Sequence, residues 1–217
     1  MNTTERIRFL DTARVIAMLW IVGFWHLVDY VGPSYEVLTF KGDGFITEIM
    51  LATFMLISGF FMSKYTFHKK QDYIAFYRKR INRFYYLYII AAILLFIIGF
   101  NPGTLRLFCT LTGLSVITMW PSTLWFLGML MMFYLYTPIL LRKGTKSVII
   151  YGAIVIVVYF VIHILLPSIY ARLNYVPRGI DDRFFLYFPI YCLGLIIGRM
   201  RILPLLMKPA WGGYILC

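Results

Sequence analysis

The sequence predicts an all-α membrane protein: a polytopic transmembrane helical bundle with about six full spans plus a partial one at the C-terminal end. Hydrophobic residues make up 61% of the 217 residues and charged residues only 14%, compared with about a quarter in soluble domains. The mean hydropathy is correspondingly high, at +0.80. Long apolar stretches also recur, each near the ~20 residues that a helix needs to cross a bilayer. Such a chain is neither disordered nor a small disulfide-stapled domain.

Six stretches are long and apolar enough to be predicted as full spans, namely residues 15–31, 45–67, 84–100, 122–141, 148–167 and 184–198. Residues 107–120 form a shorter stretch before Pro121, which favours a re-entrant or interfacial segment. Residues 209–217 begin a further apolar stretch of about half the length of a span. We therefore expect residues 1–217 to be one membrane domain that is incomplete at its C-terminal end.

Lysine and arginine residues predict the orientation of the spans, because cytoplasmic loops retain positive charge during insertion. Of the 21 lysines and arginines, sixteen fall on the side of the N-terminus and five on the other side. We therefore expect a multi-pass protein with a cytoplasmic N-terminus and the lipid bilayer as its partner. The net charge of +12 comes from short basic runs without a continuous basic face, so we predict no nucleic-acid partner.

Ionisable groups inside spans are costly and are therefore candidate functional residues. His26 lies about two-thirds of the way through the first span, and a neutral imidazole accepts a proton near pH 7. A structural role for this histidine is an equal alternative. Asp29 follows three residues later, where it would either orient the imidazole or face the outer water. Arg14 closes the cytoplasmic end of the span, where it would either bind phosphate or anchor the helix among headgroups.

A basic and aromatic block at residues 68–83 follows the second span. Anionic lipid would attract this block, and so would a polyphosphorylated donor; the electrostatics alone favour lipid. The three cysteines lack the spacing of a metal site or of a CxxC pair. We predict that no metal is bound and that the cysteines are small apolar packing residues.

Several short motifs occur in an order that is more specific than any one of them. They are FLDTAR at residues 9–14 with His26 after it, FMLISGFF at 54–61, FYRKRINR at 76–83, LWFL at 124–127 with Tyr134 and Pro138, and FP with LGLIIG within 188–198. In this combination the chain resembles the acyltransferase 3 family of integral membrane O-acyltransferases. The resemblance covers nearly the whole chain.

This resemblance implies an activity and a location. Members transfer an acyl group, commonly acetyl, from a cytoplasmic acyl-CoA to a hydroxyl of a cell-envelope glycan or glycolipid. The expected location is the inner (plasma) membrane of a bacterium, and the expected donor substrate is acetyl-CoA or another acyl-CoA. A sugar hydroxyl needs a general base to attack the thioester, and His26 matches the essential first-span histidine of the family.

The resemblance also implies roles for other residues. Arg14 matches the arginine before that histidine, and Arg80 and Arg83 match the paired arginines that are candidates for donor binding. Ser58 and Gly59 match a Ser-Gly-Phe signature, for which close helix packing is an alternative to donor contact. Trp125 and Tyr134 are candidates for the acceptor path, with aromatic packing as the alternative.

The spacing between Arg14 and His26 departs from the family by one residue, because eleven residues separate them here. Twelve positions along a regular α-helix place two side chains ~120° apart. We hypothesise a π-bulge near Gly23 that would bring Arg14 and His26 onto one face.

Two other function classes remain open at the level of the sequence. A small-solute transporter would also carry an intramembrane histidine, although we find no repeat of Gly- or Pro-broken half-helices. A noncatalytic membrane partner, derived from an acyltransferase, would fit the short chain.

Overall fold

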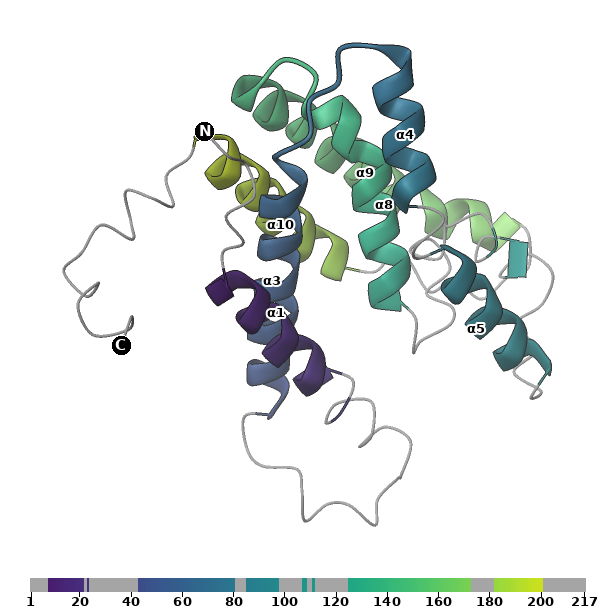
Figure 1. Ribbon diagram of the computed structural model, residues 1–217. Helices are drawn as coiled ribbons and strands as arrows, with labels where there is room; N and C mark the ends of the chain where they lie inside the picture. The colour runs from purple at the N-terminus through teal and green to yellow at the C-terminus, as the bar shows by residue number, and fades with distance from the viewer. Residues whose placement is uncertain are drawn as a thin grey trace.

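The computed structural model describes residues 8–21, 23, 43–80, 85–97, 107–108, 111, 125–172 and 182–200. Within this part of the chain the protein contains seven helices and no strand, which confirms the all-α class (Figure 1). The helices are α1 (Arg8–Trp20), α3 (Asp43–Met62), α4 (Lys70–Arg80), α5 (Tyr86–Ile97), α8 (Trp125–Leu140), α9 (Thr145–Arg172) and α10 (Arg183–Met200).

Three of the described helices are long and apolar enough to cross a membrane, through the segments Gly44–Met62, Thr145–Leu165 and Arg183–Met200. The predicted count of six full spans is therefore wrong for the part of the chain that the structure describes. Helices α9 and α10 contain the predicted stretches 148–167 and 184–198 in full, whereas α3 ends at Met62, before the end of the stretch 45–67. The described part of α8 has 16 residues and covers ~24 Å at 1.5 Å per residue, compared with the ~30 Å of the hydrocarbon core.

Helix α4 forms within the basic and aromatic block at residues 68–83, for which no helix is predicted from the sequence. Its residues Lys70–Arg80 are rich in Lys, Arg, Gln and Ala, which all favour helices. Asp72 lies in the first turn, and its Oδ2 accepts hydrogen bonds from the backbone N–H groups of His68 (2.9 Å) and Lys69 (2.8 Å). These bonds satisfy donors at the start of the helix.

Helices α3 and α10 run parallel and pack closely (Figure 1). Tyr187 donates a hydrogen bond to Glu48 near the start of both helices. A Cβ added at Gly194 would collide with the carbonyl oxygen of Leu56, and one added at Gly59 would collide with that of Tyr191. The two backbones approach this closely only because glycine has no side chain.

The remaining helices alternate in direction around this pair. Helix α1 is antiparallel to α3, because Trp20 Nε1 donates to Thr47 Oγ1 (3.0 Å) while Arg14 lies over the Phe54 ring. Helix α8 is parallel to α10, because its contacts progress from Trp125–Tyr187 to Thr137–Tyr191. Helix α9 is antiparallel to α10, because its contacts run from Gly152–Cys192 to Phe160–Phe185. A chain that crosses a membrane back and forth produces this alternation.

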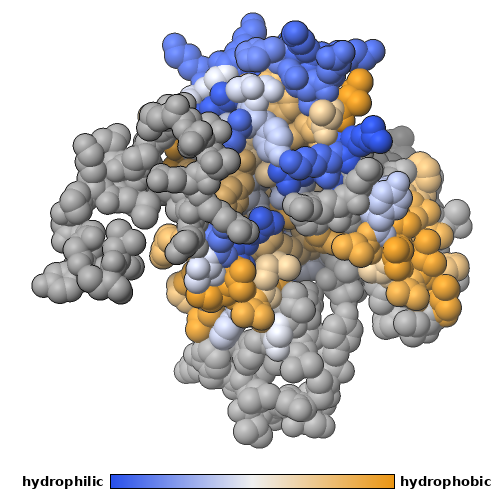
Figure 2. Space-filling view, viewed as in Figure 1, coloured by the Kyte–Doolittle hydropathy of each residue, from blue (hydrophilic) through white to orange (hydrophobic). Residues whose placement is uncertain are grey.

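An aromatic core joins α8, α9 and α10. Phe133, Phe184, Phe188 and Tyr191 are all fully buried. The ring of Tyr159 stacks on that of Phe184, with 3.9 Å between the centroids. In contrast, α5 and α9 expose many large apolar side chains. Figure 2 shows such a hydrophobic surface over α5, and hydrophilic residues gathered at the end of the molecule where α4 lies. Exposed apolar flanks with a polar end are what a membrane-embedded bundle requires.

Candidate functional site

The helix registers bring basic residues from distant parts of the chain to one end of the bundle, which we call the basic end. Arg14 comes from α1, Lys64 from the turn after α3, Arg80 from the last position of α4 and Arg199 from the end of α10. A hollow of about 340 Å³ opens there, lined by Asp11, Arg14, Phe61, Met62, Lys64, Tyr65 and Arg80. Three cations and one carboxylate line it, so the hollow favours an anionic ligand.

Arg80 is held in place by aromatic rings. Its Nη2 donates a hydrogen bond of 2.9 Å to the hydroxyl of Tyr65. Its Cζ lies 5.4 Å from the ring centroid of Tyr65, 5.5 Å from that of Tyr134 and 6.0 Å from that of Phe76. Each distance is within the range of a cation–π interaction. The Arg80 Nε is buried and has no hydrogen-bond partner among the described residues, so the hydrogen-bonding capacity of this guanidinium is not fully used by them.

Arg14 lines the same hollow from α1, where it packs against Phe54 of α3. Its Cζ is 4.9 Å above the centroid of Phe54, and the side chain is partly exposed. The aromatic ring fixes the position of the guanidinium without neutralising its charge. Arg14 and Arg80 therefore line the same hollow, and a role for either in donor binding stays a prediction.

Ser58 and Tyr134, two further predicted residues, lie beneath Arg80. Ser58 is 1% exposed, and its buried hydroxyl has no hydrogen-bond partner among the described residues, although it lies near Tyr134. Tyr134 is within electrostatic range of both Arg14 and Arg80. The structure thus brings Arg14, Ser58, Arg80 and Tyr134 together. Gly59 faces α10 instead, where close helix packing explains the need for glycine; donor contact by Gly59 stays a prediction.

Trp125 lies at the opposite end of α8 from these residues. Its ring stacks on that of Tyr187 at 6.0 Å, and the Cζ of Arg183 is 4.3 Å from the Trp125 centroid. Nine residues of helix, or ~13 Å, separate Trp125 from Tyr134. Trp125 and Tyr134 therefore lie at different levels of α8, with Tyr134 next to Arg80; a role for either residue in the acceptor path stays a prediction.

His26, Asp29 and Arg83 lie outside the described residues. The described backbone nevertheless bears on the hypothesis of a π-bulge near Gly23, because Ile21 and Gly23 have π-helical geometry directly after α1. A π-turn at this point is the feature that the extra residue between Arg14 and His26 requires. The alignment of the two side chains stays a prediction.

Tyr65 is a residue of the hollow that sequence reasoning missed. Besides accepting the hydrogen bond from Arg80, it is fixed through its backbone, because Arg199 Nη2 donates to the Tyr65 carbonyl oxygen (3.0 Å). In the sequence, a tyrosine just after a span indicates only an interfacial anchor. Its contact with Arg80, fifteen residues later, depends on how α4 folds back against the end of α3.

A model of a known protein family, described as an acyltransferase domain, matches residues 7–216. The chain belongs to the acyltransferase 3 family. This match covers almost the whole chain and confirms the resemblance found in the motifs. Together with the span-length helices, it makes the protein a membrane acyltransferase in the general sense. No curated protein and no solved structure gave a significant match.

Proposed function

We propose that this acyltransferase is an O-acyltransferase of the bacterial inner membrane. It moves an acyl group, most simply acetyl, from a cytoplasmic acyl-CoA to a hydroxyl of a cell-envelope or exported polysaccharide or of a glycolipid. The observation that carries the proposal is the basic hollow, in which Arg14, Lys64 and Arg80 converge from three segments of the chain.

The hollow suits the donor because coenzyme A carries a diphosphate and a separate phosphate group. Planar guanidinium groups bind phosphate oxygens with paired hydrogen bonds, whereas lysine contributes a compact charge. Arg80 is already oriented by Tyr65 and Tyr134, so little side-chain entropy is lost on binding. The partly exposed Arg14 supplies a second guanidinium from another helix that lines the hollow.

The location of the hollow supports donor entry from the cytoplasm. Lysines and arginines are retained on the cytoplasmic side of membrane proteins, and the hollow lies at the end where Arg14, Lys64, Arg80 and Arg199 meet. In this orientation the N-terminus is cytoplasmic. The opposite end, which carries Trp125, then faces the compartment that contains the acceptor.

The proposed reaction is direct acyl transfer with a histidine base. The acceptor hydroxyl attacks the thioester carbonyl, a C–O bond forms and the C–S bond breaks. His26 takes the hydroxyl proton and passes it to the departing thiolate, which leaves as the thiol of coenzyme A. This role for His26 rests on the family motif and on its place in the first span.

A labelling experiment tests the proposal. Membranes that contain the protein are incubated with acetyl-CoA labelled in the acetyl group and with a crude extract of envelope glycans, and base-labile ester label is measured. We expect Arg80→Ala to lower kcat/KM for the donor by roughly 100-fold, through loss of charge-assisted hydrogen bonds to phosphate. His26→Ala should lower kcat by at least about 100-fold.

Arg142→Ala is the matched control, because Arg142 is an exposed arginine in the turn after α8. It should retain activity within about twofold of the parent, as expected for a surface substitution. Ester labelling that is insensitive to both Arg80→Ala and His26→Ala would contradict the proposal. An absence of label in every sample, alongside a labelled control enzyme in the same extract, would favour a noncatalytic membrane partner.

A further inference from the structure

The structure divides the single basic block of the sequence into two faces of α4. Phe76, Tyr77 and Arg80 turn inward: Phe76 is 2% exposed and packs edge-on against Tyr65 at 5.0 Å, and the Tyr77 hydroxyl donates to the carbonyl oxygen of Leu135 (2.9 Å). These contacts fix the rotation of the helix. The opposite face is therefore presented to the surroundings of the protein.

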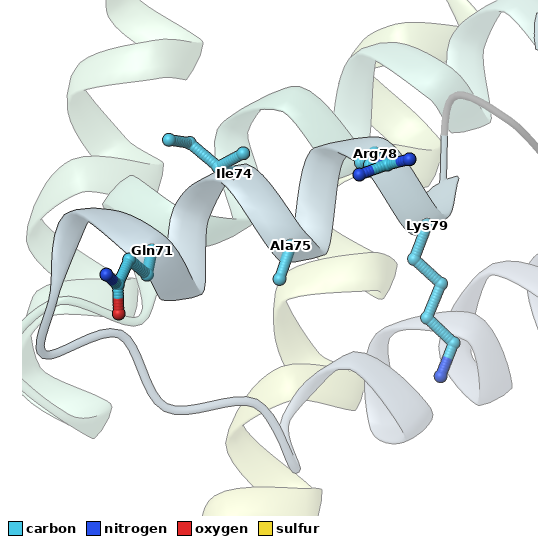
Figure 3. Close-up of a pocket in the computed structure, with 5 residues that line it drawn as sticks. All are labelled: Gln71, Ile74, Ala75, Arg78 and Lys79. Carbon is cyan, nitrogen blue, oxygen red and sulfur yellow. The ribbon is translucent and has the colours of Figure 1, made fainter.

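This outer face is lined by Gln71, Ile74, Ala75, Arg78 and Lys79 around a wide, open hollow of about 500 Å³ (Figure 3). Ile74 is 55% exposed, although it is a large apolar side chain. Arg78 and Lys79 are also exposed. An exposed isoleucine between a polar residue and two cations is typical of a helix face that lies against the headgroup region of a bilayer.

The charge of the outer face is not neutralised within the described residues. Asp72 is the carboxylate of α4, and both of its printed hydrogen bonds go to the backbone at the start of the helix. These backbone N–H groups, first that of Lys69 and then that of His68, lower the pKa of Asp72 below its ordinary value of 3.8. Arg78 and Lys79 form no ion pair with any carboxylate in the part of the chain that the structure describes.

The position of α4 in the chain places this face near the membrane surface. The span-length helix α3 ends at Met62, before α4, and α5 begins after it with the exposed side chains of Tyr86 and Leu87. Arg80 and Tyr86 are six positions apart, which at full extension is at most ~20 Å of chain. The outer cations of α4 are therefore within reach of lipid headgroups.

We propose that the outer face of α4 binds anionic phospholipid headgroups of the surrounding bilayer. The Arg78 and Lys79 side chains contact the headgroup phosphate, the Gln71 amide donates a further hydrogen bond, and Ile74 inserts among the upper acyl carbons. Arg80, on the inner face, takes no part in this contact and remains with the basic hollow. The lipid contact holds α4 at the membrane surface and so keeps Arg80 and Tyr65 together at the end of α3.

Lipid binding to the purified full chain tests this inference independently of acyl transfer. The protein in mild detergent is mixed with equal amounts of dioleoylphosphatidylglycerol and dioleoylphosphatidylcholine, and the bound lipids are counted by native mass spectrometry. We expect the parent to prefer phosphatidylglycerol. The Arg78→Gln and Lys79→Gln double variant should lose about tenfold of that preference, because each cation near an anionic surface contributes a severalfold factor.

The Lys143→Gln and Lys146→Gln double variant is the matched control, with the same loss of charge from two exposed lysines, one in the turn after α8 and one in the first turn of α9. It should change the lipid preference by less than about twofold, and helix content and elution volume should be unchanged in both variants. Raised salt should reduce the preference of the parent. Inorganic phosphate at the lipid concentration should leave bound phosphatidylglycerol in place.

Three outcomes would overturn the inference. An unchanged preference in the α4 variant would remove the site, and equal losses in both variants would leave only a general effect of net charge. Displacement of the lipid by inorganic phosphate would identify a site for free phosphate instead. Ile74→Ser gives a separate measure, because loss of insertion should weaken phosphatidylglycerol and phosphatidylcholine alike; no effect on either lipid would contradict the placement of Ile74.

Discussion

The two ends of the bundle use the same kinds of side chain with different results. At the opposite end from the hollow, Arg183 lies 4.3 Å from the centroid of Trp125, Trp125 stacks on Tyr187, and Tyr187 donates to Glu48. The cation, the two aromatic rings, the hydroxyl and the carboxylate at this end thus interact with one another. At the basic end, Arg80 is also surrounded by rings, but it keeps a donor without a partner among the described residues and borders an open hollow. The comparison teaches that residue types alone do not make a site; unsatisfied, oriented groups beside a cavity do.

The largest expected effect comes from disrupting the contact between α3 and α10, the two helices that connect the ends of the bundle. Gly194→Val should prevent recovery of monodisperse folded protein, because its Cβ would collide with the carbonyl oxygen of Leu56 where α3 and α10 meet. Gly152→Ala is the control, since a Cβ there would lie 3.5 Å from Cys192 Sγ, an ordinary contact. Size-exclusion chromatography and thermal unfolding measure both variants. A normally folded Gly194→Val protein would show that the close approach of these helices is not needed.

The second prediction exchanges the arginine at each end for lysine. Arg80→Lys should raise the donor KM on the order of tenfold, because lysine keeps the charge and loses the planar set of donors that binds phosphate. Arg183→Lys should leave the donor KM within about twofold, since Arg183 lies over Trp125 and away from the hollow. Steady-state kinetics with labelled acetyl-CoA measure both. Equal changes in KM would mean that the two ends are not distinct in donor binding.

The third prediction removes one tyrosine hydroxyl at each end. Tyr65→Phe should raise the donor KM about fivefold with little change in kcat, because the hydrogen bond that orients Arg80 is lost while the ring remains. Tyr187→Phe should lower thermal stability by about 1 kcal/mol, through loss of its hydrogen bond to Glu48, and leave KM unchanged. If Tyr65→Phe shifted only the unfolding temperature, its role would be structural and not one of positioning.

The smallest expected effect concerns the start of α4. Because the folded state holds the pKa of Asp72 below 3.8, the ionised carboxylate stabilises the helix at pH values above 3.8, and this contribution disappears as the pH falls through the lowered pKa. At neutral pH, Asp72→Asn should speed hydrogen exchange in the first turn of α4. On acidification the parent should approach the variant. Equal exchange rates in the two proteins at neutral pH would contradict a stabilising role for the Asp72 charge.

Much of the basic end was accessible from the sequence. Arg14, Ser58 and Arg80 were named from motifs, and the structure brings them together with Tyr134. The π-helical geometry at Ile21 and Gly23 agrees with the hypothesis of a π-bulge near Gly23, which came from the extra residue between Arg14 and His26. The sequence can name these residues as candidates because motif order and charge placement are properties of the chain itself; their roles stay predictions.

Other features depended on contacts between distant segments. Tyr65 was missed because nothing in its neighbourhood in the sequence points to Arg80. Tyr134 and Trp125 belong to one helix, and only the structure shows that Tyr134 contacts Arg80 whereas Trp125 contacts Arg183. Within the described residues, fewer helices reach the length of a full span than hydropathy predicts, because hydropathy identifies apolar stretches but not the residue at which a helix ends.

The sequence by itself determined that this protein is a helical membrane protein of the acyltransferase 3 family, with basic segments that belong to one side. Hydropathy and charge are properties of each segment's own residues, so they can be read from the sequence without knowing how the segment packs. Only the tertiary structure decided which basic residues enter the hollow and which face outward. The contacts of Phe76 and Tyr77 set the rotation of α4, and that rotation separates Arg80 from Arg78 and Lys79.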